Sequence, residues 1–207
     1  ERLKDDELLK IANEMDVKNV NPVQVNSYIS EIKKIYQSFG YNNIKISYNE
    51  KQSSDNNISD IYLDIDEGDI TKINNIYFNG NEYIDSRVLK DQLKSKTKTL
   101  INIFANNNFK NFVFENDVNT LIKYYKNEGF LDISIDNNIE YLGTNKVNLY
   151  FNIFEGDQYY LSDIKIVDNQ SSLSSEVINN IKLEIEKSNL INNKFSLDKI
   201  KDLKNNL

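Results

Sequence analysis

EGDITKINNIYFNGN, residues 67–81, closes one repeat of this chain and opens the next. It returns in altered form at residues 155–169 as EGDQYYLSDIKIVDN, with Gly68 lying 88 residues before Gly156. In each copy a Glu-Gly-Asp turn leads into alternating apolar residues, which is the pattern of a strand entered through a glycine turn. Because self-similarity at a fixed period indicates a repeat architecture, the remaining chain is divided by this period.

The composition limits the class of protein. Of 207 residues, 39% are hydrophobic and 28% are charged, which is typical of a globular chain rather than a disordered one. The net charge of −7 speaks against a nucleic-acid-binding surface, because phosphate contacts require clustered Lys and Arg. No apolar run approaches the roughly 20 residues that a membrane-spanning helix needs. Since Glu1 leads directly into a helical pattern, we expect the chain to be a fragment of a longer protein.

Residues 1–69 predict a helix–helix–strand–strand unit. Asn21 and Pro22 form a helix start, with a capping side chain followed by proline at the first helical position. One helix face then carries apolar residues at spacings of 4, 3 and 4, namely Val25, Ile29, Ile32 and Tyr36. Gly40 is expected to end this helix, and alternating residues beyond it predict two strands that finish at Gly68.

Residues 70–157 predict a complete unit. Asp85 is expected to cap its first helix, whose apolar face is formed by Val88, Leu89 and Leu93. A long polar connection follows, and a second helix then repeats the 4-3-4 spacing and ends at Gly129, 89 residues after Gly40. The expected strands cover residues 72–78, 131–136 and 146–154.

Residues 158–207 predict the beginning of a third unit. A strand is expected over residues 160–167, followed by helices capped at Ser174 and Ser196. Comparison with the middle unit predicts that the second helix continues beyond Leu207, so both ends of the chain are expected to lie inside a unit.

A β-α-α-β-β unit of this size resembles the POTRA domain, the polypeptide-transport-associated domain. The resemblance is carried by Ile76, Phe78, Gly80, Asn81, Asp117, Val118, Leu121, Tyr124, Tyr125, Glu128, Gly129, Phe130, Glu155, Gly156 and Asp157. It implies an α+β fold of tandem repeats, each a three-stranded mixed sheet with two antiparallel helices on one face. The units would be 1–69, truncated at its N-terminus, 70–157, complete, and 158–207, truncated at its C-terminus. Residues 155–162 and the long inter-helix connection are similar to the second to fourth units of outer-membrane assembly proteins of this family. The third unit departs from the pattern, with Asp168 and Asn169 where Gly-Asn is typical.

The resemblance implies a non-enzymatic function in the periplasm. Such a region scaffolds unfolded outer-membrane β-barrel proteins, docks accessory lipoproteins and is tethered to the outer membrane by a C-terminal barrel that lies outside this sequence. One alternative is the POTRA region of a two-partner secretion or translocation porin. Another is a divisome-type structural module without client peptides.

We expect peptide capture on an edge strand of the middle unit, because an edge presents unpaired backbone groups to an added strand. The candidate residues are Leu131, Asp132, Ile133, Ser134, Ile135, Asp136 and Asn137. Residues Leu131, Ile133 and Ile135, or alternatively Asp132, Ser134 and Asp136, would present outward backbone groups, and the pattern does not distinguish them. The residues expected to shape the backbone turns are Gly40, Gly68, Gly80, Asn81, Gly129 and Gly156.

Chemistry at a metal or nucleophile is disfavoured by the residue types present. Cysteine and histidine are absent, which removes thiolate ligands, the commonest metal ligand and the commonest general base. The acids at positions 64, 66, 67 and 69 alternate as a solvated strand face and turn, and Asp132, Ser134 and Asp136 lack the glycine of a calcium loop. No metal or cofactor is therefore expected.

Overall fold

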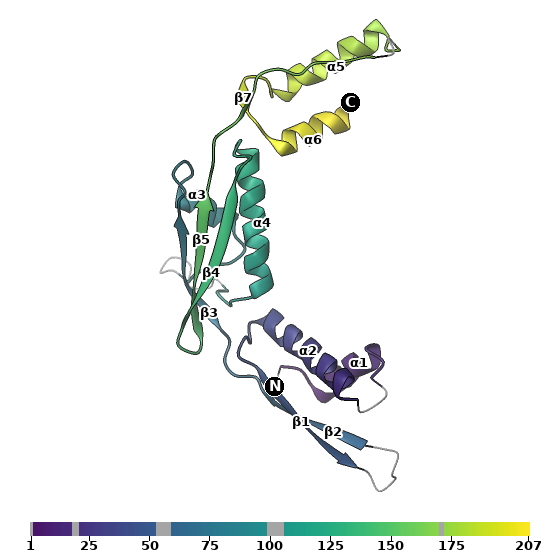
Figure 1. Ribbon diagram of the computed structural model, residues 1–207, viewed down its shortest axis with the longest axis vertical. Helices are drawn as coiled ribbons and strands as arrows, with labels where there is room; N and C mark the ends of the chain where they lie inside the picture. Colours follow the sequence, from purple (N-terminus) through teal and green to yellow (C-terminus); the bar gives the residue numbers. More distant parts are fainter. Residues whose placement is uncertain (1, 18–20, 53–58, 99–105, 170–171) are drawn as a thin grey trace. The chain divides into compact units, whose positions relative to one another are not determined.

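The computed structural model describes residues 2–17, 21–52, 59–98, 106–169 and 172–207. Its helices and strands confirm the predicted α+β class (Figure 1). The chain separates into two compact units. The first unit comprises Glu1–Ile76, Lys94–Glu115 and Ile139–Leu149, and the second comprises Tyr77–Leu93, Asn116–Asn138 and Tyr150–Leu207. The division thus falls within the middle repeat, while both Glu-Gly-Asp linkers lie inside a compact unit.

The first repeat contains two helices and an antiparallel hairpin. Its elements are α1 (Asp5–Glu14), α2 (Pro22–Phe39), β1 (Lys45–Gln52) and β2 (Ser59–Asp66). The Asn21 side chain accepts the backbone N–H of Val23 at 2.9 Å, so the predicted cap of α2 is confirmed. The helix ends at Gly40 in the left-handed conformation, with φ of 105°. The core is formed by residues of both helices and of the segments just before α1 and β1, namely Leu3, Leu8, Ile32, Tyr36 and Ile44.

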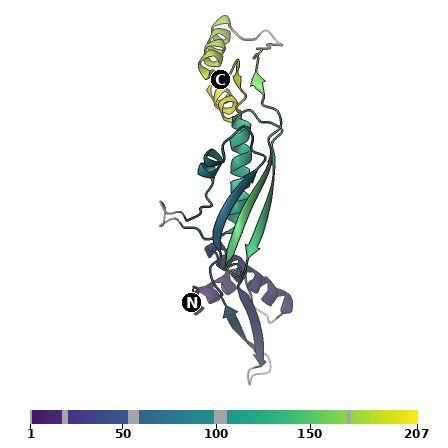
Figure 2. The same cartoon turned by 90° about the vertical axis from the view of Figure 1, so that its left-hand side faces the viewer.

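The middle repeat contains a three-stranded mixed sheet. Its elements are β3 (Lys72–Asn79), α3 (Ser86–Gln92), α4 (Asn111–Asn127), β4 (Ser134–Leu142) and β5 (Lys146–Phe154). The strand order is β3-β5-β4, which makes β5 the central strand. Figure 2 shows α3 and α4 on the same side of the strands. One face of β5 is buried against these helices through Val147, Leu149, Phe151 and Ile153.

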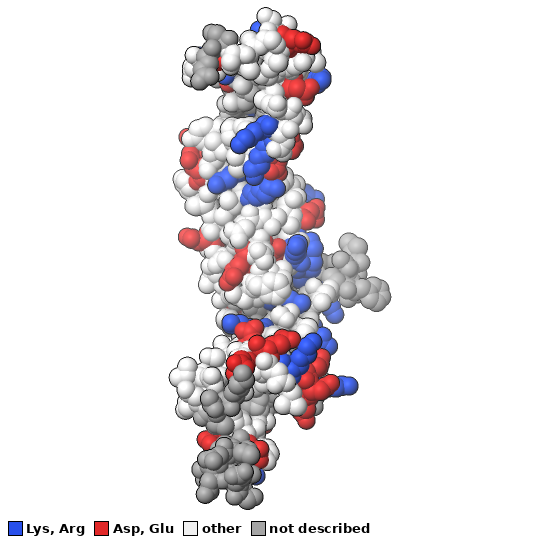
Figure 3. Space-filling view, turned by 90° about the vertical axis from the view of Figure 1, so that its right-hand side faces the viewer, with Lys and Arg blue, Asp and Glu red and all other residues white. Residues whose placement is uncertain are grey.

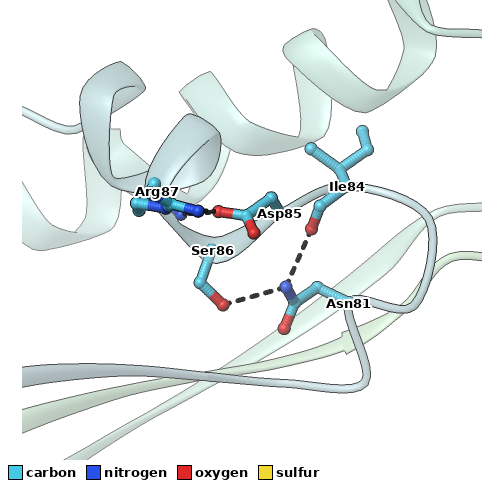
Figure 4. Close-up of polar contacts among 5 residues, drawn as sticks. All are labelled: Asn81, Ile84, Asp85, Ser86 and Arg87. Carbon is cyan, nitrogen blue, oxygen red and sulfur yellow. Dashed lines mark hydrogen bonds and ion pairs between the residues drawn. The ribbon is translucent and has the colours of Figure 1, made fainter.

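A compact turn leads from β3 into α3 (Figure 4). Gly80 has φ of 83°, and the Asn81 side-chain amide donates to the carbonyl oxygen of Ile84 at 2.8 Å and to Ser86 Oγ at 3.0 Å. The Asp85 carboxylate accepts the backbone N–H of Arg87 at 2.8 Å. This bond, with the Arg87 charge adding to it, lowers the pKa of Asp85. The predicted helix start at Asp85 is therefore confirmed.

Strand β3 does not keep a strict alternation of faces. Asn74 donates to the Asn148 side chain at 3.0 Å, and Tyr77 stacks on Tyr150 with ring centroids 4.9 Å apart. Both partners, Asn148 and Tyr150, lie on the face of β5 that points away from the helices. Asn74 and Tyr77 are three positions apart, and in a regular strand this separation would place them on opposite faces. A second amide pair on this open face joins the side chains of Asn79 and Asn152 at 2.9 Å. The alternation of faces is therefore broken between Asn74 and Tyr77.

The third repeat contains two helices and a minimal strand pair. Its elements are β6 (Tyr160–Leu161), α5 (Ser175–Ser188), β7 (Asn193–Lys194) and α6 (Leu197–Asn206). Ser174 and Ser196 cap the two helices as predicted. The strand expected over residues 160–167 is shorter, because only its first two residues are paired, with β7, and a strand needs a backbone partner. Across the described ranges, none of the helices combines the length and apolar character required to cross a membrane.

Candidate functional site

Strand β4 lies at an edge of the middle sheet. Within the described strands, β5 is its sheet neighbour. Of the seven candidate residues, Ser134, Ile135, Asp136 and Asn137 lie in β4, and all but Ile135 are exposed. Leu131 and Asp132 form a turn and Ile133 is buried, so the predicted start of the strand was three residues too early.

The residues before β4 are engaged by the linker that follows β5. The backbone N–H of Tyr159 donates to the Gly129 carbonyl oxygen at 2.8 Å, and Phe130 forms an antiparallel bridge with Gln158. The Tyr159 hydroxyl donates to Asp132 Oδ2 at 2.7 Å, which raises the pKa of Tyr159. These contacts hold the chain before β4 against the linker, and the exposed edge begins after them.

The opposite edge of the sheet is partly covered. At the start of β3, the Ile73 N–H donates to the Asn107 carbonyl oxygen at 2.7 Å. The Asn107 side-chain amide returns a bond of 3.0 Å to the Ile73 carbonyl oxygen, and Lys72 bridges Asn108. The segment before α4 therefore occupies the outer backbone groups at the beginning of β3. This leaves β4 as the better candidate for an added strand.

The glutamate of each Glu-Gly-Asp motif joins separate parts of its repeat. Glu155 is only 5% exposed, and its Oε1 accepts the Tyr125 hydroxyl at 2.8 Å. Its Oε2 accepts the backbone N–H groups of Glu82 at 2.9 Å and Tyr83 at 3.0 Å. Burial and the bond to Glu155 raise the pKa of Tyr125. The carboxylate thus ties the turn after β3 to α4 and to the end of β5.

The same arrangement occurs in the first repeat. Glu67 Oε1 accepts the Tyr36 hydroxyl at 2.9 Å and the backbone N–H of Arg2 at 2.6 Å. The bond from Arg2 is the main cause of a lowered Glu67 pKa. Tyr36 and Tyr125 occupy the last positions of the two 4-3-4 apolar spacings, and that pattern does not indicate that their hydroxyls act as donors. Their 89-residue separation, equal to that of Gly40 and Gly129, was the signal that could have revealed it.

The other acids of the first linker take part in local hydrogen bonds. Asp66 accepts the Gly68 N–H at 3.2 Å, and Asp69 accepts the Asn145 side chain at 2.6 Å. Within the part of the chain that the structure describes, potential metal ligands do not gather into groups of three or more. The glycines expected to shape turns all have positive φ, namely Gly40, Gly68, Gly80, Gly129 and Gly156.

Charged side chains on and just after α4 pair with opposite charges on β7 and α6. Lys123 Nζ lies 3.1 Å from Asp198 Oδ2, and Lys194 Nζ lies 3.2 Å from Glu128 Oε2. The bond from Lys123 is the main cause of the lowered Asp198 pKa. Figure 3 shows basic side chains beside acidic ones on the face that it views. Such mixed charge differs from the continuous basic surface that binds nucleic acid.

The linkers, the glycine turns and the β-α-α-β-β order together define a POTRA-type repeat. Residues 71–156 match the POTRA family model, described as a surface antigen variable number repeat. The middle repeat thus matches the POTRA family model over nearly its whole length, and the resemblance predicted from the sequence is confirmed.

Relatives of this chain include outer membrane protein assembly factors. BamA of Neorickettsia risticii (strain Illinois) is 25% identical over 146 residues, which cover 70% of this chain and 20% of the relative. BamA of Neisseria meningitidis serogroup B is 28% identical over 116 residues, covering 56% of this chain and 14% of the relative. The chain therefore spans a fifth or less of the length of these relatives.

A solved structure shows the same fold. The crystal structure of Haemophilus influenzae BamA POTRA3-5 aligns with all of this chain and with 80% of that structure, with a TM-score of 0.51 and 12% sequence identity. The likeness at this identity concerns the fold and confirms the tandem α+β architecture predicted above.

Proposed function

We propose that this chain is the periplasmic POTRA region of an outer-membrane β-barrel assembly factor, and that it captures unfolded barrel segments on β4. Its units are 1–69, 70–157 and 158–207. The names of the relatives and the POTRA match of the middle repeat support this assignment. Accessory lipoproteins are the proposed docking partners, and a membrane barrel in the same protein is the proposed tether.

The edge position of β4 is the observation that carries the proposal. A strand at a sheet edge offers alternate backbone N–H and C=O groups to an extended peptide, which binds by continuing the sheet. Side-chain identity contributes little to such bonds, so one edge accepts many sequences. This property fits clients that share an alternating strand pattern of about 10 residues rather than a common motif.

The register of the neighbouring backbone supports a choice between the two sets of outward groups. The bond between Tyr159 and Gly129 makes these two residues a hydrogen-bonded pair, and in an antiparallel ladder such pairs recur at every second residue. If the same alternation continues along β4, the backbone N–H and C=O groups of odd-numbered residues point toward β5. Those of even-numbered residues point outward. Asp136 therefore presents its N–H to an added strand, and Asn137 presents its N–H to β5.

Capture on this edge is expected to be weak and reversible. Each backbone hydrogen bond contributes only about 0.5–1.5 kcal/mol net, whereas ordering each peptide residue costs about 1–2 kcal/mol. A short peptide should thus bind one edge in the millimolar range, about −4 kcal/mol. Such binding suits a scaffold that must release its client.

Two proline variants test the proposal, because Asp136 and Asn137 are adjacent, polar and exposed. Asp136→Pro removes an outward donor, which an edge strand tolerates, so the thermal melting temperature should stay close to that of the unmodified chain. Asn137→Pro removes a donor to β5 and should lower that temperature. Asp136→Ala keeps the backbone donor and serves as the control for loss of charge.

The binding assay is an amide-shift titration with a ten-residue peptide that alternates apolar and polar residues. We expect shifts along β4 in the unmodified chain and in Asp136→Ala, and their loss in Asp136→Pro. Shifts centred on another element, or binding retained by a folded Asp136→Pro variant, would refute capture at β4. A folded chain that binds no such peptide would favour the function of a structural module without clients.

A further inference from the structure

The linker after β5 is hydrogen-bonded on both sides. On one side the Tyr159 N–H donates to the Gly129 carbonyl oxygen at 2.8 Å. On the other side the Tyr159 carbonyl oxygen accepts the Phe195 N–H at 2.9 Å. The pairing of β6 with β7 continues this second contact. Three backbone segments thus lie side by side, contributed by the end of α4, by the linker and by the residues before α6.

The linker after β2 makes the same two contacts. The Thr71 N–H donates to the Gly40 carbonyl oxygen at 2.9 Å, and the Thr71 carbonyl oxygen accepts the Phe109 N–H at 2.8 Å. The bridge between Lys72 and Asn108 corresponds to the pairing of β6 with β7. Gly40 and Gly129 therefore have equivalent roles, as do Thr71 and Tyr159. We call each set of three backbone segments a junction ladder.

The first junction ladder continues the preceding hairpin in register. Lys45 lies opposite Asp66 at the end of the β1–β2 pair, and counting five further residues along each segment brings Gly40 opposite Thr71. That is where the backbone hydrogen bond is found. A Cβ atom on Gly68 would lie within 3.7 Å of the Asn43 carbonyl oxygen, so the two segments also run close together between these points.

We infer that each Glu-Gly-Asp linker is a strand shared by two repeats, and that the register of one hairpin sets the position of the repeat that follows. The division of the chain into compact units agrees with this, because it passes through the middle repeat and leaves each junction ladder whole. Substitutions that keep the backbone bonds should leave the junction unchanged. A change in linker length should uncouple the two repeats.

Amide hydrogen exchange of the unmodified chain is the first test. The donors of the junction ladders are Thr71, Phe109, Tyr159 and Phe195. If the linker is a shared strand, their exchange should be slowed to within about tenfold of the amides in β5. Exchange as fast as that of solvent-exposed loop amides would overturn the inference.

An insertion provides the second test. One glycine placed between Asp157 and Gln158 shifts Tyr159 out of register with Gly129. The matched control is one glycine placed between Gly143 and Thr144 in the hairpin turn, where no atom lies within 4 Å of the position of a Gly143 Cβ. Because the chain has no native cysteine, Asn119→Cys and Lys201→Cys introduce two unique spin-label sites, on α4 and α6.

Pulsed electron resonance then measures the distribution of distances between the labels. The inference predicts a narrow distribution for the unmodified chain and for the control, and a distribution broadened about twofold or more by the linker insertion. Equal widths in all three folded proteins would overturn it. If the linker insertion prevents folding, the exchange measurement on the unmodified chain still decides the matter.

Discussion

Gly80→Ala and Gly143→Ala form a matched pair that tests how closely β3 is joined to β5. Both glycines have positive φ, 83° at Gly80 and 67° at Gly143. A Cβ atom on Gly80 would lie 2.2 Å from the carbonyl oxygen of Ile153, whereas one on Gly143 would meet no atom within 4 Å. The two substitutions thus share the conformational cost of positive φ and differ in the collision.

The magnitude follows from these two terms. A left-handed conformation costs a residue with a Cβ about 1–2 kcal/mol, and this is the whole expected effect of Gly143→Ala. For Gly80→Ala, relief of the collision must move backbone of the central strand. Overpacking of this kind costs about 1–3 kcal/mol more, so the total is about 2–5 kcal/mol. A domain is stable by only about 5–15 kcal/mol, so this loss is large.

Urea denaturation followed by far-ultraviolet circular dichroism measures both variants. We expect a substantially lower midpoint for Gly80→Ala and a small decrease for Gly143→Ala, with similar slopes. If both variants lost the same free energy of unfolding, the positive φ alone would account for the destabilisation. A Cβ atom on Gly80 would then fit beside the Ile153 carbonyl oxygen without a collision. In that case the close contact assigned to this turn would be wrong.

Three further measurements concern hydrogen bonds of the repeats. Tyr125→Phe removes the donor to Glu155 and should lower the free energy of unfolding by about 1.5–3 kcal/mol in urea melts. Tyr124→Phe, whose hydroxyl has no hydrogen-bond partner among the described residues, should cost much less, and equal losses would contradict the role of Glu155. The pKa of Tyr125 is raised in the folded chain, so as the pH rises the Tyr125 hydroxyl loses its proton in the unfolded chain before it does so in the folded chain. Stability should therefore fall as the pH rises above about 10, and less steeply in Tyr125→Phe, a difference that melts between pH 8 and 11 would detect. Asn21→Ala should lower stability by about 0.5–2 kcal/mol through loss of the α2 cap, and an unchanged midpoint would show that the cap contributes nothing.

The helix starts were predictable because their chemistry is local. Asn21, Asp85, Ser174 and Ser196 each bond to a backbone N–H two or three residues ahead, so a short sequence window contains the whole interaction. The expected exposure of helix faces was less reliable. Val88 was assigned to the apolar face of α3 but is 39% exposed, because a seven-residue helix contacts the core through few positions.

The strand limits were less predictable because they depend on distant partners. Residues 162–167 alternate as a strand should, yet the pairing of β6 with β7 stops at Leu161. Leu131 and Asp132 also have a strand pattern, and the contact of Tyr159 with Asp132 places them beside the linker instead. The edge position of β4 and the acceptor role of Glu155 likewise required the tertiary arrangement, since their partners lie far away in the sequence.

The amide pairs on the open face of the middle sheet have a consequence for solution conditions. Asn74 pairs with Asn148, and Asn79 pairs with Asn152, through groups that neither ionise nor carry net charge. The Asn79–Asn152 pair keeps the same donor and acceptor from acidic to alkaline pH. The Asn148 amide, in contrast, also donates to Glu140 Oε2 at 2.8 Å, and a carboxyl group changes its charge with pH. A change of pH therefore reaches the Asn74–Asn148 pair through Glu140, whereas the Asn79–Asn152 contact stays constant.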